Sequence, residues 1–219
     1  MKTILITGAN RGIGLELCRQ LVNRGDEVIA VCREAGKQLN ALNLRVVEGV
    51  DVSAADSVLG LQNQAGIENL DWLINNAGIL SVESLGSLDY EAMERQFMVN
   101  ALGPLRVTEA LLPKLGPGSK IGIVTSRMGS VEDNTSGGYY GYRMSKAAVN
   151  MAGMSLAQDL KEQGVAVALL HPGMVATEMT GGRGVAPEKS AGGLIARMDA
   201  LTLKDTGSFW HAEGERLPW

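Results

Sequence analysis

Thr3-Ile-Leu-Ile-Thr7-Gly8-Ala-Asn-Arg-Gly-Ile-Gly14 joins an apolar run directly to a glycine-rich turn. The run predicts a strand, and the residues that follow the turn predict an amphipathic helix. A phosphate placed at such a turn accepts hydrogen bonds from the unpaired N–H groups at the start of the helix. The glycine spacing is GxxxGxG and no Gly-Lys-Ser/Thr follows, which disfavours a nucleoside triphosphatase loop. The stretch therefore predicts a nucleotide phosphate site, with a purely structural loop as the alternative.

The remainder of the chain alternates between strand-like and helix-like segments. Short apolar runs recur at residues 27–31, 44–47, 72–75, 120–125 and 165–170, and helical patterns cover residues 12–24, 54–65, 88–115 and 139–163. A further helix is expected after Pro187, and a final strand is expected to carry His211. This order predicts an α/β fold, a Rossmann-type, doubly wound parallel β-sheet flanked by helices on both faces. We expect residues 1–219 to form one domain.

Composition excludes several function classes. The 219 residues include 20 Lys and Arg against 24 Asp and Glu, a net charge of −4, so no basic excess favours a nucleic-acid partner. The first apolar run is too short for a signal peptide and no later stretch approaches the length of a membrane span, so we expect a cytoplasmic protein with no membrane partner. Cys18 and Cys32 lack metal-ligand spacing and are interpreted as packing residues.

Tyr142-Arg-Met-Ser-Lys146 places a phenol and an ammonium one helical turn apart, on the same face of the helix predicted at residues 139–163. An opposite charge within a few ångströms stabilises the phenolate and so lowers a tyrosine pKa from its ordinary value of about 10. The spacing therefore predicts a proton shuttle usable near neutral pH. An ordinary amphipathic pair at a helix edge is the alternative.

Taken together, these motifs resemble the short-chain dehydrogenase/reductase family. They occur in the family's order across nearly the whole chain, as TGANRGIG at residues 7–14, Asn75-Asn-Ala-Gly78, Asn100, Ser126, and Tyr142 with Lys146. The chain is most similar to sniffer-type and C-factor-type members. That narrower similarity rests on Ser126-Arg-Met-Gly129, on Asn134-Thr-Ser-Gly-Gly138, and on Phe209-Trp-His-Ala-Glu-Gly214 before the final Leu-Pro-Trp219.

The resemblance assigns roles to four residues. Tyr142 would be the general acid in carbonyl reduction, and Lys146 would lower its pKa and bind ribose hydroxyls of a nicotinamide cofactor. Ser126 would hydrogen-bond the substrate oxygen, with Thr125 and Ser130 as neighbouring alternatives. In the family, the main chain at the position of Asn100 holds a water that links the lysine to solvent.

Pro104 gives the Asn100 assignment a physical basis. Proline has no N–H and its ring opposes the carbonyl four residues earlier, so the carbonyl of Asn100 should lose its normal helical partner. We therefore expect an irregular helix at Gly103-Pro104 that exposes this carbonyl. A kink that serves packing alone is the alternative.

The end of the second strand predicts the cofactor. An acidic residue there would bind the ribose 2′-hydroxyl, whereas arginine accommodates a 2′-phosphate. Cys32 occupies the position expected to be acidic, Arg33 follows it, and Arg11 could approach the same phosphate from the glycine turn. The pattern favours NADPH/NADP+ over NADH. Glu34 argues against it, and Arg33 could instead cover an exposed edge.

The resemblance also implies a wider set of cofactor contacts along one edge of the sheet, and no metal. This set is Gly8, Asn10, Arg11, Gly12, Ile13, Gly14, Arg33, Asp51, Val52, Asn75, Ala77, Gly78, Tyr142, Lys146, Pro172, Gly173, Val175 and Thr177. His171 and His211 are interpreted as structural, because no other histidine or cysteine lies at metal-ligand spacing from either of them. The substrate lid, near residues 178–195, is shorter than is usual in the family, which predicts an open pocket that suits a broad or bulky carbonyl substrate.

The sequence also predicts how the chain assembles and which reaction it catalyses. Residues 147–157 are apolar nearly all round, which predicts a second burial partner and hence a homodimer through the helices that contain Asn100 and Tyr142. We expect an NADPH-dependent oxidoreductase that reduces an aldehyde or ketone to an alcohol. The alternative is an NAD(P)-binding signalling protein of C-factor type in which turnover is secondary.

Overall fold

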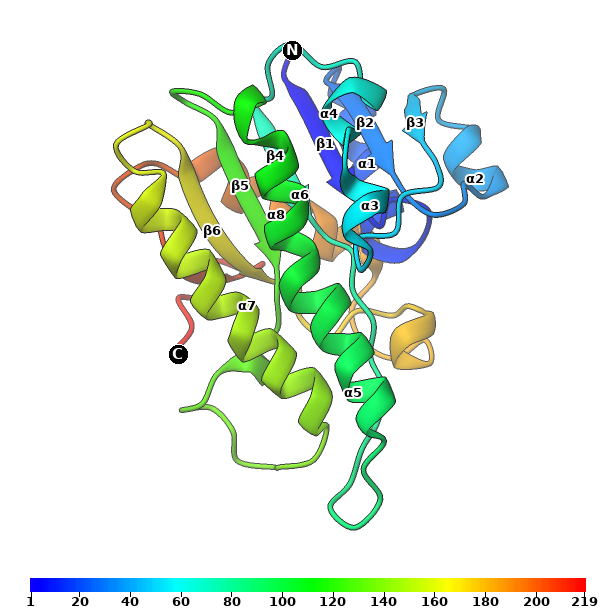
Figure 1. Ribbon diagram of the computed structural model, residues 1–219, viewed down its shortest axis with the longest axis vertical. Coiled ribbons are helices and arrows are strands. Elements are labelled where there is room, and N and C mark those ends of the chain that lie inside the picture. Colours follow the sequence, from blue (N-terminus) through cyan, green and yellow to red (C-terminus); the bar gives the residue numbers. More distant parts are fainter.

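A seven-stranded parallel sheet forms the centre of the molecule (Figure 1). The computed structural model describes residues 1–219, with the side chain of Gln62 left out. The strands lie in the order β3-β2-β1-β4-β5-β6-β7, and each pairs with its neighbours in parallel. Their bounds are β1 Thr3–Thr7, β2 Glu27–Val31, β3 Arg45–Val47, β4 Trp72–Asn75, β5 Lys120–Val124, β6 Ala166–His171 and β7 Ser208–His211. The predicted fold class is confirmed.

Helices cover both faces of the sheet. Their bounds are α1 Gly12–Asn23, α2 Lys37–Asn40, α3 Ala55–Val58, α4 Leu61–Gln64, α5 Tyr90–Phe97, α6 Gly103–Leu111, α7 Tyr140–Asp159 and α8 Pro187–Ala200. Figure 1 shows α6 and α7 side by side in front of the sheet, with α1 and α8 behind it. Each face has its own apolar core, because strands buried on both sides supply apolar residues to both layers.

Two of the predicted helices are interrupted. The single helix expected over residues 54–65 is two short helices, α3 and α4, because Gly60 has φ +78°, a left-handed conformation that ends one helix before the next begins. Short α2 was not predicted from the sequence. Among the helices that the structure describes, none is both long and apolar enough to cross a membrane.

The helix predicted over residues 88–115 changes geometry at Asn100. Between α5 and α6, residues Met98–Leu102 form a π-helical turn, in which the N–H of Gly103 donates to the carbonyl of Met98 five residues earlier. Pro104 follows directly and has no N–H to donate to the carbonyl of Asn100. The helix is thus irregular where the sequence analysis expected it. Binding of water by the Asn100 carbonyl remains a prediction.

The strand order places the site. The chain reverses its direction of strand addition between β1 and β4, and parallel sheets bind ligands at the carboxyl edge beside such a reversal. The glycine turn follows β1, Asn76 follows β4, and Ser126 follows β5. Helix α7 then carries Tyr142 and Lys146 along the face that adjoins this edge.

Candidate active site

The glycine turn is tightly closed against the segment that follows β4. Gly8 has φ +64°, and a Cβ there would lie 2.8 Å from the Cα of Ala77. A Cβ on Gly14 would lie 2.2 Å from the carbonyl oxygen of Gly8. Arg11, the residue before α1, has extended backbone and its side chain does not cap the helix. The N–H groups at the start of α1 are therefore available to an anion, which fits the predicted phosphate site.

Thr7 and Asn76 hold this turn in place, although the sequence analysis assigned neither to the site. The Thr7 hydroxyl accepts from the backbone N–H groups of Asn76 at 3.0 Å and Ala77 at 3.1 Å. The Asn76 side chain donates to the carbonyls of Thr7 at 3.0 Å and Gly8 at 3.1 Å. The signal was present in the sequence, because both residues belong to the quoted motifs, but only the fold shows that one motif binds the other.

Asn75, which the sequence analysis assigned to the cofactor, has its side chain in the core. It is buried, and its amide nitrogen donates to the hydroxyl of Thr108 on α6 at 3.2 Å. The side chain thus faces α6, whereas that of Asn76 reaches the glycine turn. Any contact of Asn75 with a cofactor would come from its backbone.

Tyr142, Lys146 and Ser126 come together at the end of β5, all three buried. The Lys146 ammonium lies 5.6 Å from the centroid of the Tyr142 ring and donates to the carbonyl of Val124 at 3.0 Å. The Ser126 hydroxyl lies close enough to Tyr142 to oppose the rise in its pKa, and it accepts from the N–H of Met128 at 3.1 Å. The structure therefore brings together three of the four residues predicted to be catalytic around one phenol.

The expectation that Lys146 lowers the pKa of Tyr142 is wrong for this arrangement. Burial raises the pKa of Tyr142 to about 12, and the hydrogen bond with Ser126 only partly opposes that rise. Burial also lowers the pKa of Lys146 to about 8, so its ammonium is still charged near neutral pH but gives up a proton more readily than an ordinary lysine. Desolvation is the largest influence on the pKa of both groups, and Tyr142 holds its proton at neutral pH.

Asn100 joins α7 to the segment after β4 through its side chain. Its amide oxygen accepts from the N–H of Ile79 at 2.9 Å, and its amide nitrogen donates to the Ile79 carbonyl at 2.9 Å and to Ser145 Oγ at 3.0 Å. Ser145 Oγ in turn donates to the carbonyl of Tyr142 at 2.8 Å. The side chain of Asn100 thus fixes the backbone of Tyr142, which leaves any water-binding role to its main chain.

Arg33 and Asp51 lie close to each other beyond β2. Arg33 is exposed, and its charge contributes to lowering the pKa of the Asp51 carboxyl, although the hydrogen bonds from Ser53 are the larger cause. Val52 is buried directly after Asp51. Asn10 donates to the carbonyl of Glu34 at 3.0 Å. An exposed arginine therefore lies at the edge where the sequence predicted a 2′-phosphate.

Arg11 forms an exposed ion pair with Glu178 across the same edge. Glu178 begins a 3₁₀ turn, Glu178–Thr180, capped by reciprocal hydrogen bonds between Thr177 and Thr180. The chain then runs back to the segment that follows β6, where Val185 pairs with Val175. Because α8 begins at Pro187 and packs on α1, only residues 178–186 of the predicted lid lie outside a long helix.

A cavity of about 440 Å³ lies behind the loop that follows β6. It is lined by Pro172, Gly173, Met174, Gly184, Val185, Lys189, Ser190, Gly193, His211, Ala212 and Glu213. Pro172 and Gly173 belong to the predicted cofactor contacts, whereas Tyr142, Ser126 and Lys146 do not line the cavity. It is thus a neighbour of the site and not the place of its chemistry.

His171 and His211 stack edge to face at the ends of β6 and β7, with ring centroids 5.0 Å apart. Burial, followed by the nearby charges of His211, Arg127 and Lys146, lowers the pKa of His171 to about 3. His171 is therefore neutral in the folded protein. Among the side chains that the structure describes, no three His, Cys, Asp or Glu gather as a metal site would require.

We expect His171 to make the fold sensitive to acid. Its pKa is about 3 in the folded protein against 6.5 normally, so the unfolded chain binds the extra proton between these values and stability is lost as pH falls from 6.5 toward 3. The loss approaches about 1.4 kcal/mol per pH unit. Urea unfolding at pH 7, 6, 5 and 4 should show a shallower loss for His171→Asn than for the wild type. Equal slopes would contradict the prediction.

Comparison with known proteins agrees with this geometry. The family of short chain dehydrogenases matches residues 2–186, and the chain belongs to that family. It is 47% identical over 227 residues to the 1-hydroxy-2-glutathionyl-2-methyl-3-butene dehydrogenase of Rhodococcus sp. (strain AD45), covering 100% of both chains. It is also 47% identical over 154 residues to the C-signal protein of Myxococcus xanthus, covering 68% of this chain and 93% of that protein.

Two solved structures extend the similarity to the fold. The NADPH-bound carbonyl reductase from chicken fatty liver superposes with a TM-score of 0.91 at 30% identity, covering 100% of this chain and 99% of that one. Carbonyl reductase Sniffer of D. melanogaster superposes with a TM-score of 0.89 at 29% identity, covering 100% of both chains. The resemblance to sniffer-type and C-factor-type members is therefore confirmed, and the chain is an enzyme of the short-chain dehydrogenase/reductase class.

Proposed function

We propose that this protein is an NADPH-dependent reductase of aldehydes or ketones, with Tyr142 as the general acid. One observation carries the proposal: a buried phenol meets a serine hydroxyl and a lysine ammonium at the carboxyl edge of the sheet. The glycine turn that suits a dinucleotide phosphate opens at the same edge. Similarity to an NADPH-bound carbonyl reductase over the whole chain supports the choice of reaction and cofactor.

The residues fit each part of such a reaction. The bound dinucleotide supplies the hydride. Ser126 is placed to donate a hydrogen bond to the carbonyl oxygen, and Tyr142, protonated at neutral pH, supplies the proton that the oxygen gains on reduction. Lys146, with a pKa of about 8, can return a proton toward Tyr142 when the cycle ends. Burial of all three excludes water and strengthens their electrostatic interactions.

The remaining cofactor contacts follow the same edge. Thr177 and Val175 sit on the closed turn after β6, close to the glycine turn, since a Cβ on Gly12 would lie 3.3 Å from Thr177 Cγ2. Gly78 is close to the catalytic group as well, because a Cβ there would lie 3.7 Å from Lys146 Nζ. Arg33, the glycine turn, Thr177 and Lys146 are therefore the groups along this edge that would hold a dinucleotide.

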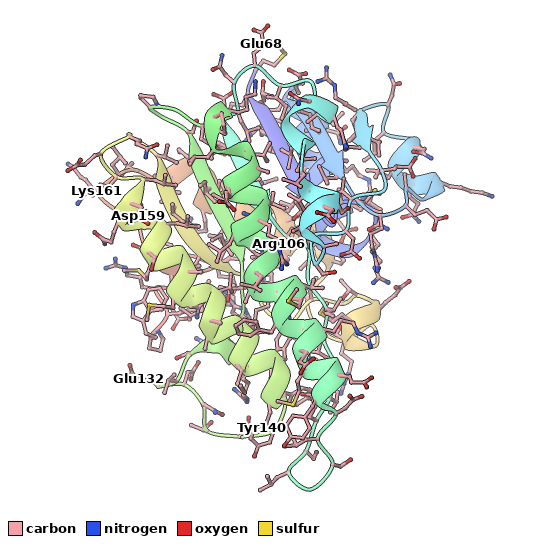
Figure 2. The ribbon with its side chains drawn as sticks, viewed as in Figure 1. Glu68, Arg106, Glu132, Tyr140, Asp159 and Lys161 are labelled. Atoms are coloured by element: carbon pink, nitrogen blue, oxygen red, sulfur yellow. The ribbon has the colours of Figure 1, made fainter. Side chains whose placement is uncertain are left out.

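We expect Arg33→Ala to reduce the preference for NADPH. A hydrogen bond to a charged group contributes about 1.5–3 kcal/mol, so kcat/KM for NADPH should fall roughly 10–100-fold while that for NADH changes little. The matched control is Lys161→Ala; Figure 2 shows Lys161 at the opposite end of α7 from Tyr140, and it should leave both values unchanged. A wild type that uses NADH better than NADPH would overturn the cofactor proposal.

The function is tested by following NADPH oxidation over a panel of aldehydes, ketones and quinones. Because the Rhodococcus relative is named for a glutathionyl alcohol, the panel includes a glutathione-conjugated alcohol with NADP+ in the oxidative direction. The lid of residues 178–186 is short, and Met179 within it and Met174 before it are exposed, which suits a bulky substrate. Turnover that survives Tyr142→Phe would contradict the assigned acid.

A signalling role remains the second candidate, favoured by the similarity to C-signal over 68% of this chain. In that case dinucleotide occupancy, and not turnover, would produce the output. A Gly14→Ala protein that loses biological function while Tyr142→Phe retains it would favour the signalling role. The reverse result would favour the reductase.

We also propose a homodimer through α7 and the helical segment that carries Asn100. These elements leave large apolar side chains exposed, namely Phe97, Met98, Met144 and Met151. α7 packs beside α5 and the segment Met98–Leu102, and exposed apolar side chains on neighbouring helices suit pairing across a two-fold axis. Sedimentation at micromolar concentration should give the mass of two chains, and Met151→Glu should shift it toward one. A wild-type monomer would contradict the proposal.

A further inference from the structure

A buried carboxylate outside the proposed catalytic set touches the first turn of α7. Glu83 lies in the loop between β4 and α5, and only 1% of its surface is exposed. One carboxylate oxygen accepts from the backbone N–H of Gly141 at 3.1 Å. The other accepts from Gln96 Nε2 at 2.8 Å and from the Ser81 hydroxyl. Gly141 immediately precedes Tyr142, so the Glu83 carboxylate is hydrogen-bonded to the residue next to the proposed acid.

The start of α7 depends on this contact. Tyr139, the residue before the helix, has φ +52°, a left-handed conformation unusual for a bulky residue, and supplies no side-chain cap. Its N–H donates to the backbone carbonyl of Glu83 at 3.0 Å. Glu83 thus takes one N–H on each side of the helix start, in place of a cap from α7 itself. Figure 2 shows neighbouring Tyr140 beside the loop before α5.

Close packing brings the helix to the carboxylate. A Cβ on Gly141 would lie 2.4 Å from Gln96 Nε2 and 2.8 Å from Met93 Cγ, so only glycine allows α7 to approach α5 this closely. Gln96 is fully buried, and its orientation is fixed because its amide oxygen accepts from the N–H of Ser81 at 3.1 Å. Its nitrogen therefore has to face Glu83.

A carboxylate is required because both of its oxygens face donors. An ionised carboxylate only accepts hydrogen bonds, whereas a glutamine has one amide nitrogen that only donates. In Glu83→Gln this nitrogen would face either the Gly141 N–H or Gln96 Nε2, which are both donors. One buried donor would lose its partner, and the charge at the positive end of α7 would be lost as well.

We propose that Glu83 is a positioning residue of the active site, which fixes the first turn of α7 and thereby the place of Tyr142 beside Ser126. The inference rests on the proposed role of Tyr142 as the acid. Glu83 acts through Gly141 and does not touch the reacting atoms. Its loss should therefore reduce the chemical step more than the binding of cofactor or substrate.

The test compares the full-length Glu83→Gln protein with the wild type and with Glu94→Gln, a control that alters an exposed carboxylate on α5. Turnover is normalised to NADPH-binding sites and measured well below the melting temperature. We expect Glu83→Gln to lower kcat at least tenfold, with KM for the carbonyl and Kd for NADPH within threefold of the wild type. Hydrogen exchange of amides 139–143 should be at least tenfold faster. Glu94→Gln should match the wild type in every measurement.

The outcomes separate this inference from the function on which it rests. A wild type without turnover on any carbonyl overturns the proposed function, and the exchange rates then still decide whether Glu83 holds the helix start. Wild-type kcat or wild-type exchange in Glu83→Gln overturns the inference alone. A purely stabilising role would lower the melting temperature and leave kcat per binding site unchanged. Glu83→Asp, which keeps the charge but falls one methylene short of Gly141, should give the same two changes if Glu83→Gln does not fold.

Discussion

Replacing Tyr142 by phenylalanine is expected to lower kcat for carbonyl reduction about a thousandfold, within the range that a positioned general acid contributes. The change removes one oxygen and leaves the ring that packs beneath Lys146. Burial holds the pKa of this phenol at about 12, so at neutral pH the group carries the proton that the reduced oxygen needs. A thousandfold loss corresponds to about 4 kcal/mol of transition-state stabilisation.

The measurement is single-turnover NADPH oxidation with the best substrate of the panel, beside the Kd for NADPH. Because the ring and Lys146 remain, that Kd should stay within a few-fold of the wild type. Tyr140→Phe is the matched control, since it removes the same oxygen two residues earlier on α7 and should leave kcat unchanged. Equal losses in both variants would show that a general disturbance of the helix, and not the Tyr142 proton, accounts for the effect.

Gly14→Ala should weaken cofactor binding strongly and lower the stability of the fold. The added Cβ would lie 2.2 Å from the Gly8 carbonyl oxygen and 2.5 Å from Asn76 Nδ2, and neither atom is the end of a long flexible side chain. The glycine turn must open to relieve the overlap, which moves the N–H groups at the start of α1. Losing two hydrogen bonds to a charged phosphate should weaken NADPH binding at least about 100-fold. Overpacking should cost about 1–3 kcal/mol of stability.

Two measurements check this. NADPH titration followed by protein fluorescence gives the Kd, and thermal unfolding should show a decrease of about 2–4 °C for each kcal/mol lost in a chain of this size. Gly116→Ala is the control, because a Cβ there meets nothing within 4 Å and its backbone is not left-handed. It should bind NADPH and unfold as the wild type does. Tight NADPH binding by Gly14→Ala would show that the turn tolerates a side chain.

Much of the fold could be predicted from the sequence because its signals are local. The run Thr3–Thr7 and the turn after it predict a strand, a phosphate site and the start of a helix within twelve adjacent residues. Alternation of buried strands and helices then predicts a parallel sheet, which the strand order confirms. Pro104 predicted an irregular helix at Asn100 for the same reason, because the effect of a proline on the preceding turn is covalent and local.

The errors occurred where non-local packing decides. The i to i+4 spacing of Tyr142 and Lys146 suggested a lowered phenol pKa, but spacing carries no information on burial, which raises it. Asn75 and Asn76 are identical neighbours in the sequence. Their successive side chains leave the end of β4 in different directions, one toward Thr108 in the core and the other toward the glycine turn.

The sequence by itself determined the fold class and the family, and it singled out Tyr142, Lys146 and Ser126 as the proposed acid, lysine and serine, since each depends on residue type and short spacing. Only the tertiary structure decided that Glu83, 59 residues before Tyr142, holds the helix that carries it. It also decided that Thr7 and Asn76, which are 69 residues apart in the sequence, join the two motifs to which they belong. Contacts of this kind depend on how strands and helices pack in the folded chain. The residues next to Glu83 or Thr7 in the sequence do not indicate which distant residue each will contact.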